Sequence, residues 1–195
     1  MKCFGTRRGF SLLELLVVVA ILSLLAVLLT PAVNTILRAA QLNKAGNLVV
    51  NNLSLAYEEA VVRNNEIVVR LFKYPDNSPN PGWGAVQILR RQSGGTLVPI
   101  TKVLEMPNTM RIVDDPKVSP LLGLANPGPA GIELPPFGEV ATKSFRFRPG
   151  GALDPQFSSD PVLTIQSVTE SKVPGANFFT LRINPITGKV TIYRP

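Results

Sequence analysis

Hydrophobic and polar residues divide the chain into three regions. The first, residues 10–30, carries no charge apart from Glu14. Its 21 residues would form about 31 Å of helix at about 1.5 Å per residue, which matches the hydrocarbon thickness of a bilayer. The pattern therefore predicts a transmembrane helix over residues 10–33. Pro31 is expected to kink this helix where it leaves the lipid.

The second region, residues 34–65, keeps a helical period but has two unlike faces. Apolar residues recur at steps of three and four, and polar residues occupy the opposite side. This pattern predicts an amphipathic stalk helix that ends at Asn64–Asn65. Gly46 is expected to weaken its middle by about 1 kcal/mol relative to alanine. The apolar positions are Leu42, Ala45, Val49, Leu53, Ala56 and Ala60.

The third region, residues 66–195, changes to the alternation and β-branched composition of strands. Residues 114–140 are rich in proline and glycine, which predicts a long loop with at most a short helix. Residues 184–188 form a turn sequence, so a closing antiparallel hairpin is expected. The predicted fold is α+β, with one long helix packed on an antiparallel β-sheet head. The expected strands span residues 66–72, 85–90, 97–104, 110–113, 144–148, 162–168, 178–184 and 189–193.

Two aromatic and two basic residues alternate in the expected strand at 144–148. Phe145 and Phe147 fall on one face, and Arg146 and Arg148 fall on the other. The arginines could bind an acidic ligand, but a solvated strand face is the favoured interpretation. Three acids of the head could belong to a calcium site, but their spacing lacks a pattern of oxygen ligands, so no metal site is expected. These acids are Asp114, Asp115 and Asp154.

Cysteine and histidine usage excludes most catalytic sites. Cys3 is the only thiol, and the chain contains no histidine. A Ser-His-Asp triad, a Cys-His pair and a histidine zinc site are therefore all excluded. We expect neither an enzyme nor a bound cofactor.

Glu14 is costly in its predicted surroundings. A carboxylate in a membrane span costs about 2.5 to 3.5 kcal/mol at mid-membrane and less toward the interface. A buried carboxylate needs a counter-charge, and the remainder of residues 10–30 offers none. A partner cation from outside this segment is therefore expected.

The segment from Gly9 to Ile21, Gly-Phe-Ser-Leu-Leu-Glu-Leu-Leu-Val-Val-Val-Ala-Ile, resembles the processing and methylation segment of type IV pilins and type II secretion pseudopilins. The resemblance implies that residues 1–9 are a leader, which prepilin peptidase removes by cutting between Gly9 and Phe10. The same enzyme would methylate the new amine of Phe10. Glu14 would then pair with the N-terminal amine of a neighbouring pilin-like subunit in a filament.

The rest of the chain resembles a narrower group. The helix, the Phe-Arg-Phe-Arg-Pro-Gly-Gly segment and the closing hairpin are similar to minor pseudopilins of the H and fimbrial T type. Residues 61–65, 83–87 and 193–195 resemble the Verru_Chthon cassette protein D family. This resemblance implies a pilin-like head and a minor subunit.

Charge refines the expected partners and topology. The formal charge is +7, and loss of Lys2, Arg7 and Arg8 with the leader leaves 17 basic and 13 acidic residues, a net +4. The leader charges predict a cytoplasmic N-terminus with the head exported to the periplasmic side of the inner membrane. The other basic residues form no stripe with aromatics, so nucleic acid is not an expected partner.

The patterns, with the resemblance to type IV pilins and pseudopilins, imply a non-catalytic, prepilin-like structural subunit of a pilus or pseudopilus. The alternative is a monomeric, single-pass membrane-anchored binding protein of the cell envelope. A conventional signal peptide competes for the N-terminus, with residues 30–32 as a poor cleavage site that would leave a start near Val33.

Overall fold

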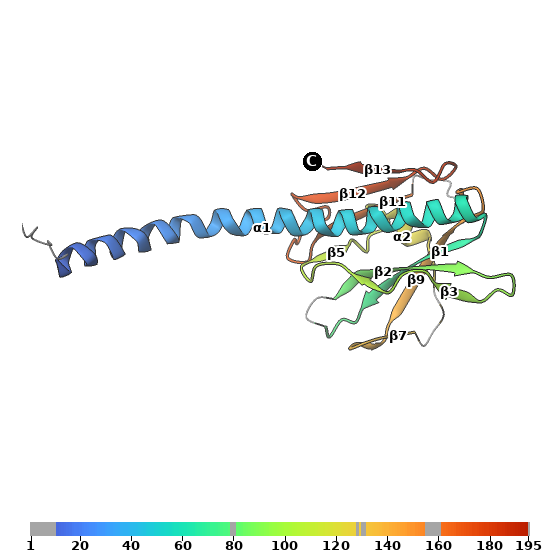
Figure 1. Ribbon diagram of the computed structural model, residues 1–195, viewed down its shortest axis with the longest axis horizontal. Coiled ribbons are helices and arrows are strands. Elements are labelled where there is room, and N and C mark those ends of the chain that lie inside the picture. The colour runs from blue at the N-terminus through green and yellow to red at the C-terminus, as the bar shows by residue number, and fades with distance from the viewer. Residues whose placement is uncertain (1–10, 79–80, 128, 130–131, 155–160, 195) are drawn as a thin grey trace, which may run out of the picture. The chain divides into compact units, whose positions relative to one another are not determined.

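The computed structural model describes residues 11–78, 81–127, 129, 132–154 and 161–194, with the backbone alone at residues 28–32 and 127. Chain contacts divide it into two units, Met1–Arg38 and Ala39–Pro195. Helix α1, Leu12–Arg63, contributes residues to both units (Figure 1). The expected leader and Phe10 lie outside the described residues.

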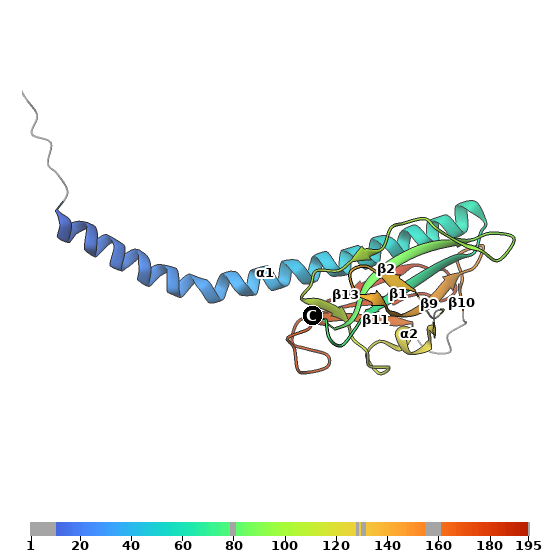
Figure 2. The same cartoon turned by 90° about the horizontal axis from the view of Figure 1, so that it is seen from below.

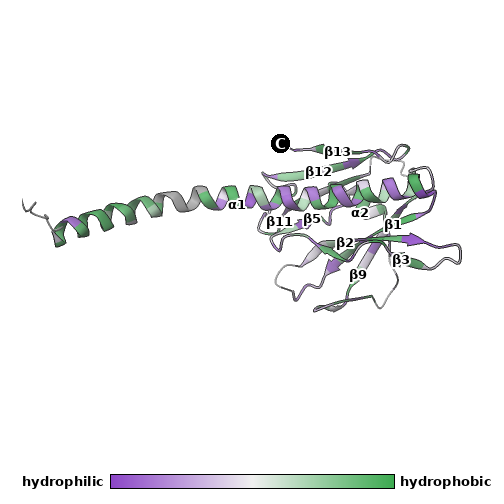
Figure 3. Ribbon diagram, viewed as in Figure 1, coloured by the Kyte–Doolittle hydropathy of each residue, from purple (hydrophilic) through white to green (hydrophobic). Residues whose placement is uncertain are grey.

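In the first unit, most of the described residues of α1 are apolar, as the hydropathy colouring of Figure 3 shows, and their side chains are exposed. Within the part of the chain that the structure describes, no helix is both long enough and apolar enough to cross a membrane. Pro31 lies within α1, but its side chain is not among those described. The kink at Pro31 therefore stays a prediction.

In the second unit, α1 packs on an antiparallel sheet through its apolar stripe (Figures 1 and 2). All six predicted stripe positions, from Leu42 to Ala60, are buried. The helix ends at Arg63, directly before the Asn64–Asn65 pair. Asn64 has a φ of 50°, the left-handed conformation that commonly ends a helix and that asparagine tolerates.

The sheet runs in the order β10-β9-β1-β2-β5-β11-β12-β13, and every paired strand is antiparallel to its neighbour. The short strands β3 and β4 pair with β2, and β6 pairs with β9. The observed α+β architecture agrees with the prediction. The strands of this sheet are β1 Ile67–Tyr74, β2 Gly82–Arg91, β3 Leu97–Pro99, β4 Leu104–Glu105, β5 Met110–Ile112, β6 Asn126–Pro127, β9 Ala141–Phe147, β10 Leu153–Asp154, β11 Val162–Ser167, β12 Phe178–Ile183 and β13 Val190–Tyr193.

Residues 114–140 contain more structure than the expected loop. They hold the short helix α2, Pro120–Leu124, strand β6 and a two-stranded hairpin of β7, Glu133–Leu134, and β8, Gly138–Glu139. Leu121, Leu122 and Leu134 are buried. Strands of two residues are too short to show alternation, so the sequence pattern missed them.

The core has two parts on the two faces of β1. Ile67, Val69 and Leu71 join the larger cluster with α1. Phe72 and Tyr74, which follow on the strand, join a smaller cluster with Leu134, Val140 and other residues. Since successive side chains of a strand point to opposite faces, the second face of the sheet is also partly covered.

The closing hairpin of β12 and β13 forms as expected. Its turn contacts α1 through Gly188. Asn184 Oδ1 accepts hydrogen bonds from the backbone N–H groups of Ile186 and Thr187. A Cβ atom on Gly188, which has a φ of +66°, would collide with the ring of Tyr57 on α1. Glycine is therefore needed there for both backbone conformation and space.

Candidate functional site

Of the three residues predicted to act in processing and assembly, the structure describes only Glu14. Gly9 and Phe10 lie outside the described residues. Glu14 is in the first turn of α1, where a carboxylate interacts favourably with the helix dipole, and it is exposed. Along the sequence, no basic residue occurs between Glu14 and Arg38. Among the described residues, Glu14 forms no ion pair.

The surface around Glu14 is almost wholly apolar. Leu13 and Leu15, its neighbours in sequence, are 72% and 61% exposed. Such a continuous apolar surface indicates a site that is covered by lipid or by another protein. The larger exposed apolar residues of this segment are Leu12, Leu13, Leu15, Leu16, Val17, Val18, Val19, Ile21, Leu22, Leu24, Leu25 and Val27.

The comparisons with known proteins identify this segment. Residues 5–30 match the family model described as the prokaryotic N-terminal methylation motif. This match confirms the coarse prediction of a type IV pilin-like N-terminus and supports a prepilin-like precursor that prepilin peptidase processes. No curated protein and no solved structure matches the chain. The resemblance to minor pseudopilins and to Verru_Chthon cassette protein D stays a prediction.

Arg146 and Arg148 are not simply a solvated strand face. Arg146 Nε donates to Asp154 Oδ2 at 2.5 Å, and Arg148 donates to Asp154 Oδ1. Arg146 Nη1 also donates to Glu66 Oε1 at 3.1 Å, and Arg91 Nε donates to the same oxygen at 2.5 Å. The alternation predicted from sequence is correct, but both arginines bind acids of the chain itself.

Asp154 is the central acid of this network. Its side chain is 9% exposed, and it lies in β10, which pairs with β9. Burial opposes its charged form, but hydrogen bonds from Arg146 and Arg148 outweigh that effect, so the pKa of Asp154 is lowered. The sequence raised Asp154 only as a disfavoured calcium ligand. Its place beside the arginines was missed, because strand β10 has only two residues and shows no alternation.

The acids of the head do not gather around one point. Asp114 Oδ2 lies 3.6 Å from Lys73 Nζ, and Asp154 is held by two guanidinium groups. Across the described residues, no group of three metal-ligating side chains occurs.

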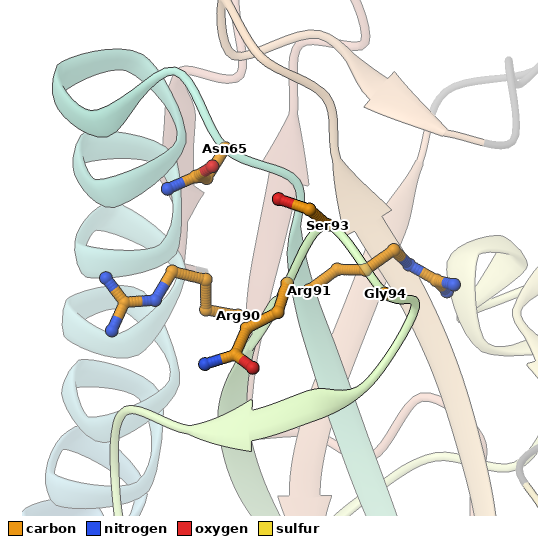
Figure 4. Close-up of a pocket in the computed structure, with 6 residues that line it drawn as sticks. Asn65, Arg90, Arg91, Ser93 and Gly94 are labelled. Atoms are coloured by element: carbon orange, nitrogen blue, oxygen red, sulfur yellow. The ribbon is translucent and has the colours of Figure 1, made fainter.

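An open depression of about 470 Å³ lies where α1 leads into the sheet (Figure 4). Asn65, Arg90, Arg91 and Ser93 line it with two further residues. Arg90 and Arg91 are consecutive on β2, and Figure 4 shows Arg90 directed toward α1 and Arg91 directed away from it. The two guanidinium groups therefore belong to opposite faces of the sheet.

Proposed function

We propose that the chain is a structural subunit of a type IV pilus-like or type II secretion filament. The match of residues 5–30 to the methylation motif carries this proposal. The exposed apolar surface of α1 and the α+β head are consistent with it. We further propose a minor pseudopilin of the H or fimbrial T type, with no catalytic role.

Processing would supply the charge that Glu14 lacks. Prepilin peptidase would cut between Gly9 and Phe10 and methylate the new amine. An N-methyl amine remains a base, so it can still carry a positive charge. An amine on a neighbouring subunit could then pair with Glu14 within the apolar surface. A carboxylate in such a surface is stabilised only by a close opposite charge, so the pair would also fix how neighbouring helices align.

The proposed location is the inner membrane, with residues 10–33 spanning it before assembly. The N-terminus would face the cytoplasm, and the head would lie on the periplasmic side. The uncharged sequence after Glu14 and the basic residues of the leader support this arrangement.

A membrane-anchored monomer that binds a ligand is the competing function, and substitution of Glu14 separates the two. In cells that make the companion subunits, Glu14→Ala should be processed normally. Its cross-links to neighbouring pilin-like subunits should fall at least about tenfold, because breaking a buried ion pair costs about 3 to 5 kcal/mol.

The matched control is Glu58→Ala, which removes an exposed acid from the stalk part of the same helix. It should cross-link as the wild type does. Equal cross-linking of Glu14→Ala and wild type would contradict the subunit proposal and favour the anchored monomer.

A further inference from the structure

The face of the sheet opposite α1 carries a groove lined by three arginines on three neighbouring strands. We call it the arginine groove and define it by Arg70 of β1, Arg91 of β2 and Arg146 of β9. Its volume is about 270 Å³. Ser144 and Asn126 add polar groups to its lining.

The pairing of the strands explains this arrangement. Arg70 is opposite Ser144 in the β1–β9 register, and Val68 is opposite Arg146. Val69, Leu71 and Phe145 point into the core with α1, so their sequence neighbours point the other way. The three guanidinium groups therefore reach the same face from adjacent strands.

Arg70 is the unusual member of the groove. Its Nε atom is buried and has no hydrogen-bond partner among the described residues. An unsatisfied buried donor on a charged group is destabilising, because it loses its hydration without gaining a hydrogen-bond partner. Burial also lowers the pKa of Arg70, because the charged guanidinium loses hydration. A ligand that accepted a hydrogen bond from Arg70 would remove this penalty.

The charge around the groove favours an anion. Arg91 and Arg146 share one carboxylate oxygen of Glu66, and Arg146 and Arg148 share Asp154. The four guanidinium groups of Arg70, Arg91, Arg146 and Arg148 face the two carboxylates of Glu66 and Asp154. Their sum leaves a local charge of +2. Arg70 takes part in none of these ion pairs.

We propose that the arginine groove binds a carboxylate group, with Arg70 as its principal donor. The planar fork of a guanidinium matches the two oxygens of a carboxylate. Glu66 shows that Arg91 and Arg146 already bind this group. The volume admits one small group rather than a polymer. The carboxylate comes either from an acidic side chain of another protein or from a small free acid.

This inference uses only residues of the second unit, so it does not depend on the proposed processing or assembly. The full chain in detergent micelles is titrated with acetate at constant ionic strength, and chloride replaces acetate in the reference. The backbone amide of Ser144, followed by NMR, reports binding in every variant. We expect a saturable shift for acetate and none for chloride.

Substitution of Arg70 tests its role. Arg70→Gln should weaken acetate binding at least about tenfold, or about 1.4 kcal/mol, because it removes the charge-assisted hydrogen bonds of the guanidinium. Arg70→Lys keeps the charge without the fork and should bind with intermediate affinity. The matched control is Arg90→Gln, which removes an arginine one residue from Arg91 on the other face, and it should bind as the wild type does.

A short acidic peptide, compared with acetate at equal carboxylate concentration, identifies the source. Tighter binding of the peptide supports a protein side chain, and equal binding supports a small free acid. Non-saturable shifts, or wild-type affinity in a folded Arg70→Gln or Arg70→Lys protein, would overturn the proposal. Loss of processing or assembly would leave these results unchanged, so the two proposals fail separately.

Discussion

At the scale of single residues, Gly46 shows how packing can reverse a local preference. Judged from sequence alone, glycine weakens the stalk helix. In the structure, a Cβ atom at this position would lie 2.5 Å from ring atoms of Phe179 on β12. Phe179 is buried in the core, so its ring has little room to move. Gly46 therefore allows the helix to approach the sheet closely.

Gly46→Ala should destabilise the protein despite the better helix propensity of alanine. Overpacking of a core costs about 1 to 3 kcal/mol, which exceeds the gain of about 1 kcal/mol in propensity at most sites. We expect a net loss of about 1 kcal/mol in the free energy of unfolding, measured by urea titration. Gly94→Ala is the control, since no atom lies within 4 Å of its added Cβ, and it should change stability by less than about 0.5 kcal/mol. A stabilised Gly46→Ala protein would contradict this packing.

Asp154 leads to a prediction about pH. Its pKa is lowered in the folded state, so its contribution to stability is present above the unfolded pKa of about 3.9 and is lost as the pH falls through the folded pKa. Arg146 and Arg148 are about half exposed, so solvent screening reduces the effect of the pairs. Asp154→Asn should lower stability by about 1 kcal/mol at pH 7.

The difference between the wild type and Asp154→Asn should shrink as the pH is lowered below about 4, when Asp154 becomes protonated in both folded and unfolded states. Urea titrations at several pH values measure it. Asp115→Asn, which alters a half-buried acid outside the network, is the control and should keep the stabilisation that the Asp154 ion pairs provide. A difference that is constant from pH 7 to below pH 3 would contradict the role of the ion pairs.

At the scale of elements, the closing hairpin is stabilised by its contact with the stalk helix. The turn at Gly188 meets Tyr57, and the Gly151 turn approaches the same ring. The backbone N–H of Leu153 donates to the carbonyl of Pro185 at 2.8 Å, which joins the two turns. Two turns that are distant in sequence therefore converge on one aromatic residue of α1.

Gly188→Ala should destabilise the protein more than an ordinary substitution at a positive φ. Gly138 has a φ of +73° with no atom within 4 Å of an added Cβ, so Gly138→Ala reports the backbone cost alone, about 1 kcal/mol. Gly188→Ala adds collisions with the ring of Tyr57 and the backbone oxygen of Gly151, so it should cost about 1 to 3 kcal/mol more. Thermal unfolding of both variants measures this difference. Equal losses would show that the close contacts of Gly188 with Tyr57 and Gly151 contribute nothing.

The sequence was informative where a pattern extended over several residues. The stripe from Leu42 to Ala60, the alternation at Phe145 and Phe147 and the closing hairpin all have repeats long enough to detect. Strands of two residues, including β10 with Asp154, contain no detectable repeat. The arginine groove was missed for a different reason, because it needs Arg70, Arg91 and Arg146 on three strands whose register the sequence does not state.

At the scale of the whole molecule, one helix changes character along its length. Its described residues before Arg38 expose apolar side chains on all sides, and residues after Ala39 bury one stripe against the sheet. The motif at residues 5–30 coincides with the exposed apolar part of the helix, whereas the arginine groove lies in the head. Our proposals therefore place assembly in the N-terminal part and ligand recognition in the head.

The mature N-terminus is the most direct test of this account. The protein is purified from cells with and without prepilin peptidase, and its N-terminal peptide is measured by mass spectrometry. We predict a chain that begins at a methylated Phe10 when the peptidase is present and retains residues 1–9 when it is absent. A chain that keeps its leader in both strains, or that begins near Val33, would contradict the account.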